Sequence, residues 1–244
     1  MIDIHCHLLP GIDDGARTLA EGLEMARAAV ANGIDYAVMT PHMHPGRYEN
    51  TRTTIEASLV DFQDALRREK KPLECGAAAE VRLSPEILPL MEQDELAFLG
   101  EMDGYRILLL EFPHSHIPLG ADNLARKLLD SKIRPIIAHP ERNKAVINDL
   151  TKIELFVEMG CLLQLTASAV AGRFGAGPHQ CARQLLELGA VTVLATDAHN
   201  LKGRRHELRE AMEAAADIIG AEAAHALVHK NPWAIVGSGS ASFH

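Results

Sequence analysis

The sequence predicts an α/β fold in which a parallel sheet closes into a barrel. Along the 244 residues, short apolar segments alternate with amphipathic helical segments, which is typical of parallel strands joined by helices. Polar side chains recur at the carboxyl ends of many of these strands, the face on which (β/α) barrels build active sites. An open doubly wound sheet is the alternative. It is disfavoured because the chain has neither a GxGxxG nor a Walker-type phosphate loop.

About seven strands are expected, each a short apolar segment bounded by turn residues. The run Ile-Leu-Leu-Leu within 106–112 is typical of a strand buried on both faces. The strands are expected at residues 2–5, 36–40, 73–81, 106–112, 135–138, 162–165 and 191–195.

Helices are expected between these strands from capping residues and apolar spacing. Thr18-Leu19-Ala20-Glu21 has the form of a capping box, and the segment ends at a Gly stop. The apolar residues of 51–70 recur at helical spacing. Trp233 is expected to anchor the C-terminal helix. The helices are expected at residues 18–32, 51–70, from 84 onward, and at 122–131, 151–159, 179–188, 206–219 and 222–228.

Composition indicates one domain over residues 1–236, followed by a flexible Gly- and Ser-rich tail at residues 237–244. Apolar residues make up 47% of the chain, enough for a sizeable core. A net charge of −9 argues against binding to nucleic acid or to an anionic membrane. No apolar run approaches the ~20 residues that span a bilayer, and no secretion signal is recognised, so we expect a cytoplasmic protein without membrane insertion. Its oligomeric state is left open.

Metal-competent side chains follow six of the expected strands. His5 and His7 flank one residue of the first strand, so both imidazoles can face one metal ion. Any one such residue is ordinarily structural, but burying many of them together is costly without cations to compensate them. The pattern therefore predicts a metal site. The other candidates are Asp13, Asp14, His42, His44, Glu80, Glu111, His139, Glu141, Asp197 and His199.

The ligand types indicate the ions and the chemistry. Mixed His and carboxylate ligands suit Mn, Fe, Co or Zn better than Mg or Ca. There are more candidates than one ion can use, so two or three divalent ions are expected. Closely spaced ions can activate water and hold both oxygens of an in-line phosphoryl displacement. The sequence thus predicts a metal-dependent phosphoester hydrolase.

Cysteine-based phosphatase chemistry is excluded. Such an enzyme needs an arginine six positions after its nucleophilic cysteine. The four cysteines lie far apart and are expected as free thiols. The residues at that offset are Ile12, Val81, Ala167 and Glu187.

Five segments and Glu80 resemble a known superfamily. The segments are MIDIHCHLLPGIDDGA, TPHMHPGRY, LLLEF, IAHPER and ATDAHN. They are similar to the polymerase and histidinol phosphatase (PHP) superfamily, and within it to the bacterial manganese-dependent protein-tyrosine phosphatases of capsule and exopolysaccharide systems. The resemblance covers position 1 to about position 236. It implies a distorted seven-stranded (β/α) barrel with three metal ions, Mn favoured. The implied substrate is a tyrosine-phosphorylated protein, a bacterial tyrosine kinase that regulates polysaccharide synthesis.

The resemblance also implies how the site residues are shared. Arg142 and Arg204 would bind the substrate phosphate, since guanidinium groups bind phosphate oxygens bidentately. Arg205 stays an alternative to Arg204, and Asp13 to Asp14. The implied ions would be held by His5, His7, Glu80 and Asp197; by Glu80, Glu111 and His139; and by His42, His199 and Asp14.

Several assignments stay open. Either His44 or a metal-bound water could be the general acid, and Arg47 and Tyr48 of the same loop could line the site or lie on the surface. A small metabolite such as histidinol phosphate, or a short nucleotide, is the alternative substrate. A metal-stabilised binding module without turnover is disfavoured, because every expected ligand type is present. The net charge and the DDGA, HPER and DAHN segments favour the tyrosine phosphatase.

Overall fold

The structure is a computed structural model that describes residues 1–237, so residues 238–244 of the expected tail lie outside the described range. Strands and helices alternate along the chain, as expected. The strands are β1 (Ile2–Cys6), β2 (Tyr36–Met39), β3 (His42–Met43), β4 (Glu74–Ala77), β5 (Glu80–Arg82), β6 (Gly100–Met102), β7 (Tyr105–Glu111), β8 (Ile133–Ala138), β9 (Leu162–Thr166) and β10 (Val193–Ala195).

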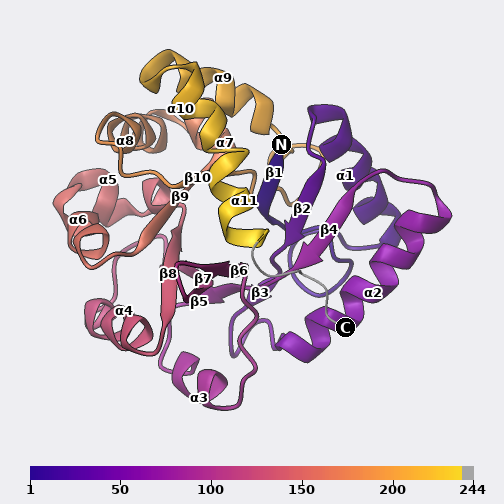
Figure 1. The fold of residues 1–244 in the computed structure, drawn as a ribbon, viewed down its shortest axis with the longest axis horizontal. Coiled ribbons are helices and arrows are strands. Elements are labelled where there is room, and N and C mark those ends of the chain that lie inside the picture. The colour runs from indigo at the N-terminus through magenta and orange to yellow at the C-terminus, as the bar shows by residue number, and fades with distance from the viewer. Residues whose placement is uncertain (238–244) are drawn as a thin grey trace.

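Helices surround the strands on the outside (Figure 1). They are α1 (Leu19–Asn32), α2 (Arg52–Arg68), α3 (Ile87–Glu92), α4 (Ala121–Asp130), the 3₁₀ turn η1 (Pro140–Arg142), α5 (Lys144–Asn148), α6 (Thr151–Glu158), α7 (Ala167–Val170), α8 (Ala176–Glu187), α9 (Leu208–Ile219), α10 (Ala221–Ala226) and α11 (Lys230–Val236).

The strands form a distorted parallel barrel, which confirms the expected fold class. Two sheets with the orders β1-β2-β4 and β10-β9-β8-β7-β5-β3 make its two parts. The chain passes from β2 into β3, and from β4 into β5, after breaks of two residues. The expected strand at 73–81 is therefore two strands. Hydrogen bonds cross the breaks, for example from Ala78 N to Met39 O at 2.8 Å.

The barrel closes where the first and last strands meet, a contact that we call the seam (Asp3, His5, Cys6, Thr196 to Ala198). Cys6 and Ala198 form a parallel bridge, and Asp197 N donates to His5 O at 2.7 Å. The buried carboxylate of Asp3 accepts hydrogen bonds from both the backbone N–H and the hydroxyl of Thr196. The seam thus joins β1 to the end of β10 at the edge where ligand candidates follow both strands.

The barrel interior is apolar and its amino-terminal end is covered by α11. Ile235 and Val236 of this helix belong to the same buried cluster as Ile4 of β1. Figure 1 shows α11 lying across the strands. A Cβ on Gly100 would lie 2.1 Å from the oxygen of Ile235, so only glycine allows this contact. The prediction that Trp233 anchors this helix is wrong. Trp233 is 58% exposed, and the neighbouring Ile235 and Val236 are buried instead.

One hairpin was not expected. β6 pairs antiparallel with β7, and the turn between them, Asp103-Gly104, has positive φ at both residues. Asp-Gly is a typical type I′ hairpin signal, but a strand of three residues has too few side chains to show a periodicity. Within residues 1–237, no helix has both the length and the apolar character that crossing a membrane requires.

Candidate metal centre

The predicted metal-binding residues come together at the carboxyl edge of the barrel. In three groups of side chains, the possible ligand atoms all lie within 4.8 Å of one another. His139 lies outside these groups, but its Nε2 is 2.8 Å from Glu80 Oε1. The groups are His5, His7, Glu80 and Asp197; His7, Asp14, His42 and His199; and His42, Glu80 and Glu111.

Two of these residues have an unusual backbone. His139 follows β8 with φ 37°, and Asp197 follows β10 with φ 51°. Non-glycine residues in this left-handed region cost about 1–3 kcal/mol and persist where the surrounding structure holds them. Such departures gather at functional sites, and here both lie at strand ends that face the same cluster.

Neighbouring side chains orient the imidazoles of β1. His5 Nδ1 donates to Oε1 of Gln164 at 2.9 Å, with both residues fully buried. His7 Nδ1 donates to Oδ2 of Asp13 at 2.6 Å. Each bond places the proton on Nδ1 and leaves Nε2 as the lone-pair donor toward the cluster.

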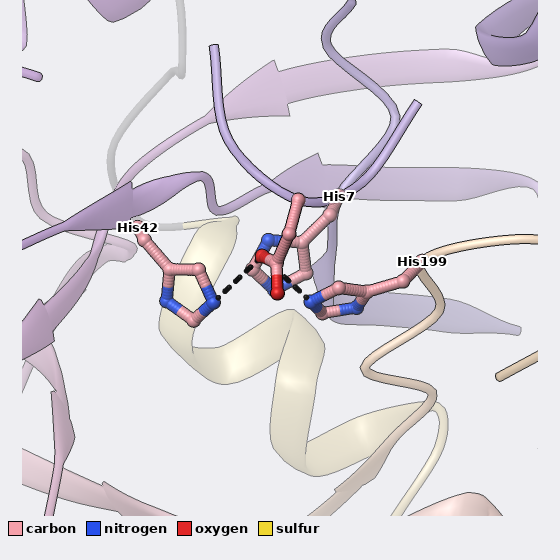
Figure 2. A group of neighbouring side chains, drawn as sticks. His7, His42 and His199 are labelled. Carbon is pink, nitrogen blue, oxygen red and sulfur yellow. Dashed lines mark ion pairs between the residues drawn. The ribbon is translucent and has the colours of Figure 1, made fainter. Parts of the chain in front are cut away.

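The two adjacent aspartates differ in their contacts. Asp13 is occupied by its own loop, since Oδ1 accepts from Gly15 N at 2.9 Å and Oδ2 also accepts from His42 N at 3.1 Å. Asp14 faces the cluster: its Oδ1 lies 3.2 Å from His42 Nε2 and 3.5 Å from His199 Nε2. Dashed lines in Figure 2 mark these two ion pairs. The geometry therefore favours Asp14 over Asp13 as a candidate ligand.

Three buried atoms in the cluster make no hydrogen bond within residues 1–237, although each lies 3.0–3.5 Å from an ion-pair neighbour. They are Oε2 of Glu80, Oδ1 of Asp197 and Nε2 of His199. A buried polar atom without a hydrogen bond costs about 1–3 kcal/mol, so such atoms are rare. Carboxylate oxygens and imidazole nitrogens are also the lone-pair donors that divalent first-row ions take. The cluster fits such ions.

The cluster holds two carboxylates in the charged form. Burial works against ionisation of Glu80, but the positive charges of the nearby His5 and His42 outweigh it and hold the pKa of Glu80 well below its usual range. Burial likewise opposes ionisation of Asp197, and Arg204 and His5 outweigh it and lower its pKa. Both carboxylates are therefore in the ionised form that binds a metal ion.

Glu111 differs from these two carboxylates. Burial, and then the charge of Glu80, raise the pKa of Glu111 to about 7. Arg82 offsets part of this effect, with Nη1 2.8 Å from Glu111 Oε2. Sequence reasoning missed Arg82, although it lies two residues after Glu80 on β5, the spacing at which strand side chains share a face.

The predicted arginines lie against the cluster. Arg142 and Arg204 both donate to Oδ2 of Asp197. Arg205 points elsewhere and pairs with Glu207 at 2.8 Å. The geometry therefore favours Arg204 over Arg205 as the functional arginine.

A hollow of about 240 Å³ opens above these groups. Tyr48 is the only residue with a carbocyclic ring among those that line it, and its ring stacks on His42 with a centroid distance of 5.4 Å. Arg47 lies over the Tyr48 ring at 5.0 Å. The loop that carries both residues is closed by hydrogen bonds between His44 and Tyr48. The hollow is lined by Asp14, His42, His44, Arg47, Tyr48, Arg82, Glu111, His114, His139, Arg142 and Arg204.

Known proteins are similar to this chain in sequence and in fold. The family model described as capsular polysaccharide synthesis, CpsB/CapC, matches residues 1–237. The tyrosine-protein phosphatase YwqE of Bacillus subtilis is 35% identical over 212 residues, which cover 87% of this chain and 82% of the relative.

Solved structures agree. One from a study of YwqE from Bacillus subtilis and CpsB from Streptococcus pneumoniae, "unique metal-dependent tyrosine phosphatases", superposes with a TM-score of 0.91 at 32% identity. It covers 98% of this chain and 96% of that one. A phosphotriesterase homology protein from Escherichia coli has a TM-score of 0.61 at 12% identity, covering 96% and 97% of the two chains, and shares the fold alone.

Proposed function

This chain belongs to the CpsB/CapC family of capsular polysaccharide synthesis, and we propose that it is a metal-dependent protein-tyrosine phosphatase. One observation in particular supports the proposal. A single hollow joins the metal-competent cluster to two arginines aimed at it, Arg142 and Arg204. Metal ions and guanidinium groups are two of the means by which proteins bind and activate a phosphoryl group.

Two or three divalent ions, with Mn favoured, are the proposed cofactors. When bound, such ions lower the pKa of water and polarise the phosphoryl oxygens. His5 and His7 are suited to ligation because their Nδ1 protons are already engaged, which leaves Nε2 available. The proposed ligands are His5, His7, Asp14, His42, Glu80, Glu111, His139, Asp197 and His199.

The arginines would hold the phosphate. Both already donate to one carboxylate oxygen of Asp197, and both line the hollow. An arriving phosphate dianion offers oxygens of the same kind and brings more charge. Arg142 and Arg204 would therefore orient the phosphate and stabilise the charge that develops on its oxygens during displacement.

The substrate class follows from the leaving group. A phenol has a pKa near ~10, so a tyrosine side chain leaves with less help from a general acid than an aliphatic alcohol does. Tyr48 lines the hollow with its ring stacked on His42 and covered by Arg47, so the ring of a phosphotyrosine would contact the edge of the Tyr48 ring. Four arginines line the hollow of a chain whose net charge is −9, so positive charge is concentrated where the phosphate would bind.

The biological partner is proposed from the family. We take it to be a tyrosine-phosphorylated protein, a bacterial tyrosine kinase that regulates capsule or exopolysaccharide synthesis. The two proteins would interact in the cytoplasm. Neither nucleic acid nor membrane insertion is part of the proposal. Residues 1–236 would be the catalytic domain.

The test compares substrates under controlled metal content. The purified chain is given a phosphotyrosine peptide, a matched phosphoserine peptide, histidinol phosphate and a dinucleotide, with Mn or with a chelator. We expect chelator-sensitive phosphate release, fastest from the phosphotyrosine peptide. A preference for histidinol phosphate or the dinucleotide would refute the substrate, and release that survives the chelator would refute the metal dependence.

The role of the Tyr48 side chain is tested separately by substitution. Tyr48→Ala should reduce the preference for phosphotyrosine over phosphoserine, whereas Tyr48→Phe should retain it. Tyr105 is the matched control: its ring packs with Lys132 and Arg134, outside the hollow. Equal losses from Tyr48→Ala and Tyr105→Ala would argue against a role for Tyr48 in binding the ring.

A further inference from the structure

A second hollow of about 570 Å³ adjoins the metal centre. It shares Asp14 with the first hollow and is also lined by His199, so the two hollows adjoin at the cluster. One wall is α1 and the other is the loop that follows β10. We call this second hollow the flanking groove. Its lining residues are Asp14, Gly15, Arg17, Glu21, Glu24, Met25, His199, Asn200, Leu201 and Lys202.

The loop wall is braced by hydrogen bonds. Oδ1 of Asn200 accepts from the backbone N–H of Lys202 at 2.9 Å and of Gly203 at 2.9 Å. The carbonyl of Arg204 accepts from the backbone N–H of Asn200 at 3.1 Å. This loop presents Leu201 with 41% of its surface exposed toward the groove that it lines. A leucine left exposed on a fixed loop offers apolar surface that a partner can cover at little entropic cost.

The groove also carries charges of both signs. On α1, Arg17 and Glu21 pair with each other. Glu24 of α1 and Lys202 of the loop form no ion pair with any residue of 1–237, so each is available to a partner. One exposed leucine with unpaired charged groups on both walls matches a polypeptide better than a purely apolar or purely anionic ligand.

We propose that the flanking groove binds the substrate polypeptide next to its phosphotyrosine, with an apolar side chain against Leu201. The inference rests on the proposed function, because it places the phosphate in the adjoining hollow. An extended chain advances about 3.3 Å per residue, and the groove adjoins the first hollow at Asp14, so the side chain in the groove would lie a few residues from the phosphotyrosine. Hollows of about 300–1,000 Å³ enclose drug-sized ligands, so this one has room for a short peptide segment.

The test uses one substrate that reaches the groove and one that does not. A phosphotyrosine peptide with leucines beside the phosphotyrosine is compared with p-nitrophenyl phosphate, by the ratio of their kcat/KM values. Leu201→Asp should lower this ratio about tenfold and Leu201→Ala less, since the apolar contact is lost. Leu188→Asp is the matched control, because Leu188 is 63% exposed and lines neither hollow.

A peptide series checks the same contact from the other side. Replacing each flanking leucine in turn by aspartate should lower kcat/KM at one position for the native chain, and Leu201→Asp should remove that sensitivity. If the ratio is unchanged in Leu201→Asp, or falls equally in Leu188→Asp, the groove proposal is overturned while phosphatase activity stands. If the native chain hydrolyses neither substrate, the proposed function fails, and the groove proposal with it.

Discussion

Gln164 of β9 offers a direct test of how the metal centre is built. It lies outside the proposed ligand set, yet its Oε1 accepts the Nδ1 proton of His5 at 2.9 Å, and both side chains are fully buried. Gln164→Leu keeps the approximate volume and removes the acceptor. His5 can then rotate or carry its proton on Nε2, the nitrogen that would bind an ion.

The expected loss of metal affinity follows from this one hydrogen bond. Supporting partners of ligating histidines are worth about 10- to 100-fold in metal affinity. That range corresponds to about 1.4–2.8 kcal/mol of binding free energy. The free energy of unfolding should fall by only about 1 kcal/mol, because leucine also removes the Nε2 of Gln164, which has no partner within residues 1–237.

Metal affinity is measured on the stripped protein by competition with a chromophoric chelator, and stability by urea unfolding in a metal-chelating buffer. Gln63→Leu is the matched control, because Gln63 donates one hydrogen bond, to Cys75 O at 2.8 Å, away from the cluster. We expect both variants to lose some stability and only Gln164→Leu to lose metal affinity. A metal affinity in Gln164→Leu within twofold of the native value would refute the reasoning.

Arg204→Ala should lower kcat for a phosphotyrosine peptide about 100-fold, because a donor to the charged phosphate is lost, whereas Arg205→Ala should change kcat less than twofold in the same steady-state assay. Similar losses in both would contradict the assignment. Thr196→Val removes the hydroxyl donor to buried Asp3 and should lower the free energy of unfolding by about 1–3 kcal/mol in urea; a native-like midpoint would show that the seam does not depend on it. Burial lowers the pKa of His206 from 6.5 to about 4, so protonation favours the unfolded chain and stability is lost as pH falls from about 6.5 toward 4. His206→Leu should therefore lose about 2 kcal/mol less than the native chain between pH 7 and pH 5, and parallel stability curves would rule this out.

The fold was largely predictable because its strands are short apolar runs between helices with clear caps. The apolar run expected at 106–112 corresponds to β7. As expected, Thr18 caps the start of α1, and Gly33 lies at its end. The break near Ala78 was not predictable, because the apolar pattern continues through it while the barrel bends. The prediction for Trp233 was wrong because it rested on the size of the side chain. The position of α11 decides which of its residues face the barrel, and Trp233 is not one of them.

The candidate site was predictable only in part. Ligand types at strand ends converge because parallel strands end at one edge, so His139 and Asp197 could be grouped with the β1 histidines. Asp13 and Asp14 could not be separated, since they are neighbours of equal chemistry and only their hydrogen bonds distinguish them. The role of Gln164 could not be predicted from the sequence. The side-chain amide of a glutamine can hydrogen-bond to many kinds of donor and acceptor, so its type alone does not identify His5 as the partner.

The seam has a consequence for unfolding. Asp3 and Thr196 are 193 positions apart in sequence, yet they are bonded in the barrel. Ligands proposed for one ion come from both sides of this contact, His5 from the first strand and Asp197 from beyond the last. An ion held by both is a reversible cross-link between the two ends of the chain, and cross-links that close long loops remove the most entropy from the unfolded state in the chain-entropy model. The concentration of metal ions would thus determine how readily the barrel opens at the seam. Once the ions are removed, amide hydrogen exchange should be fastest at the seam.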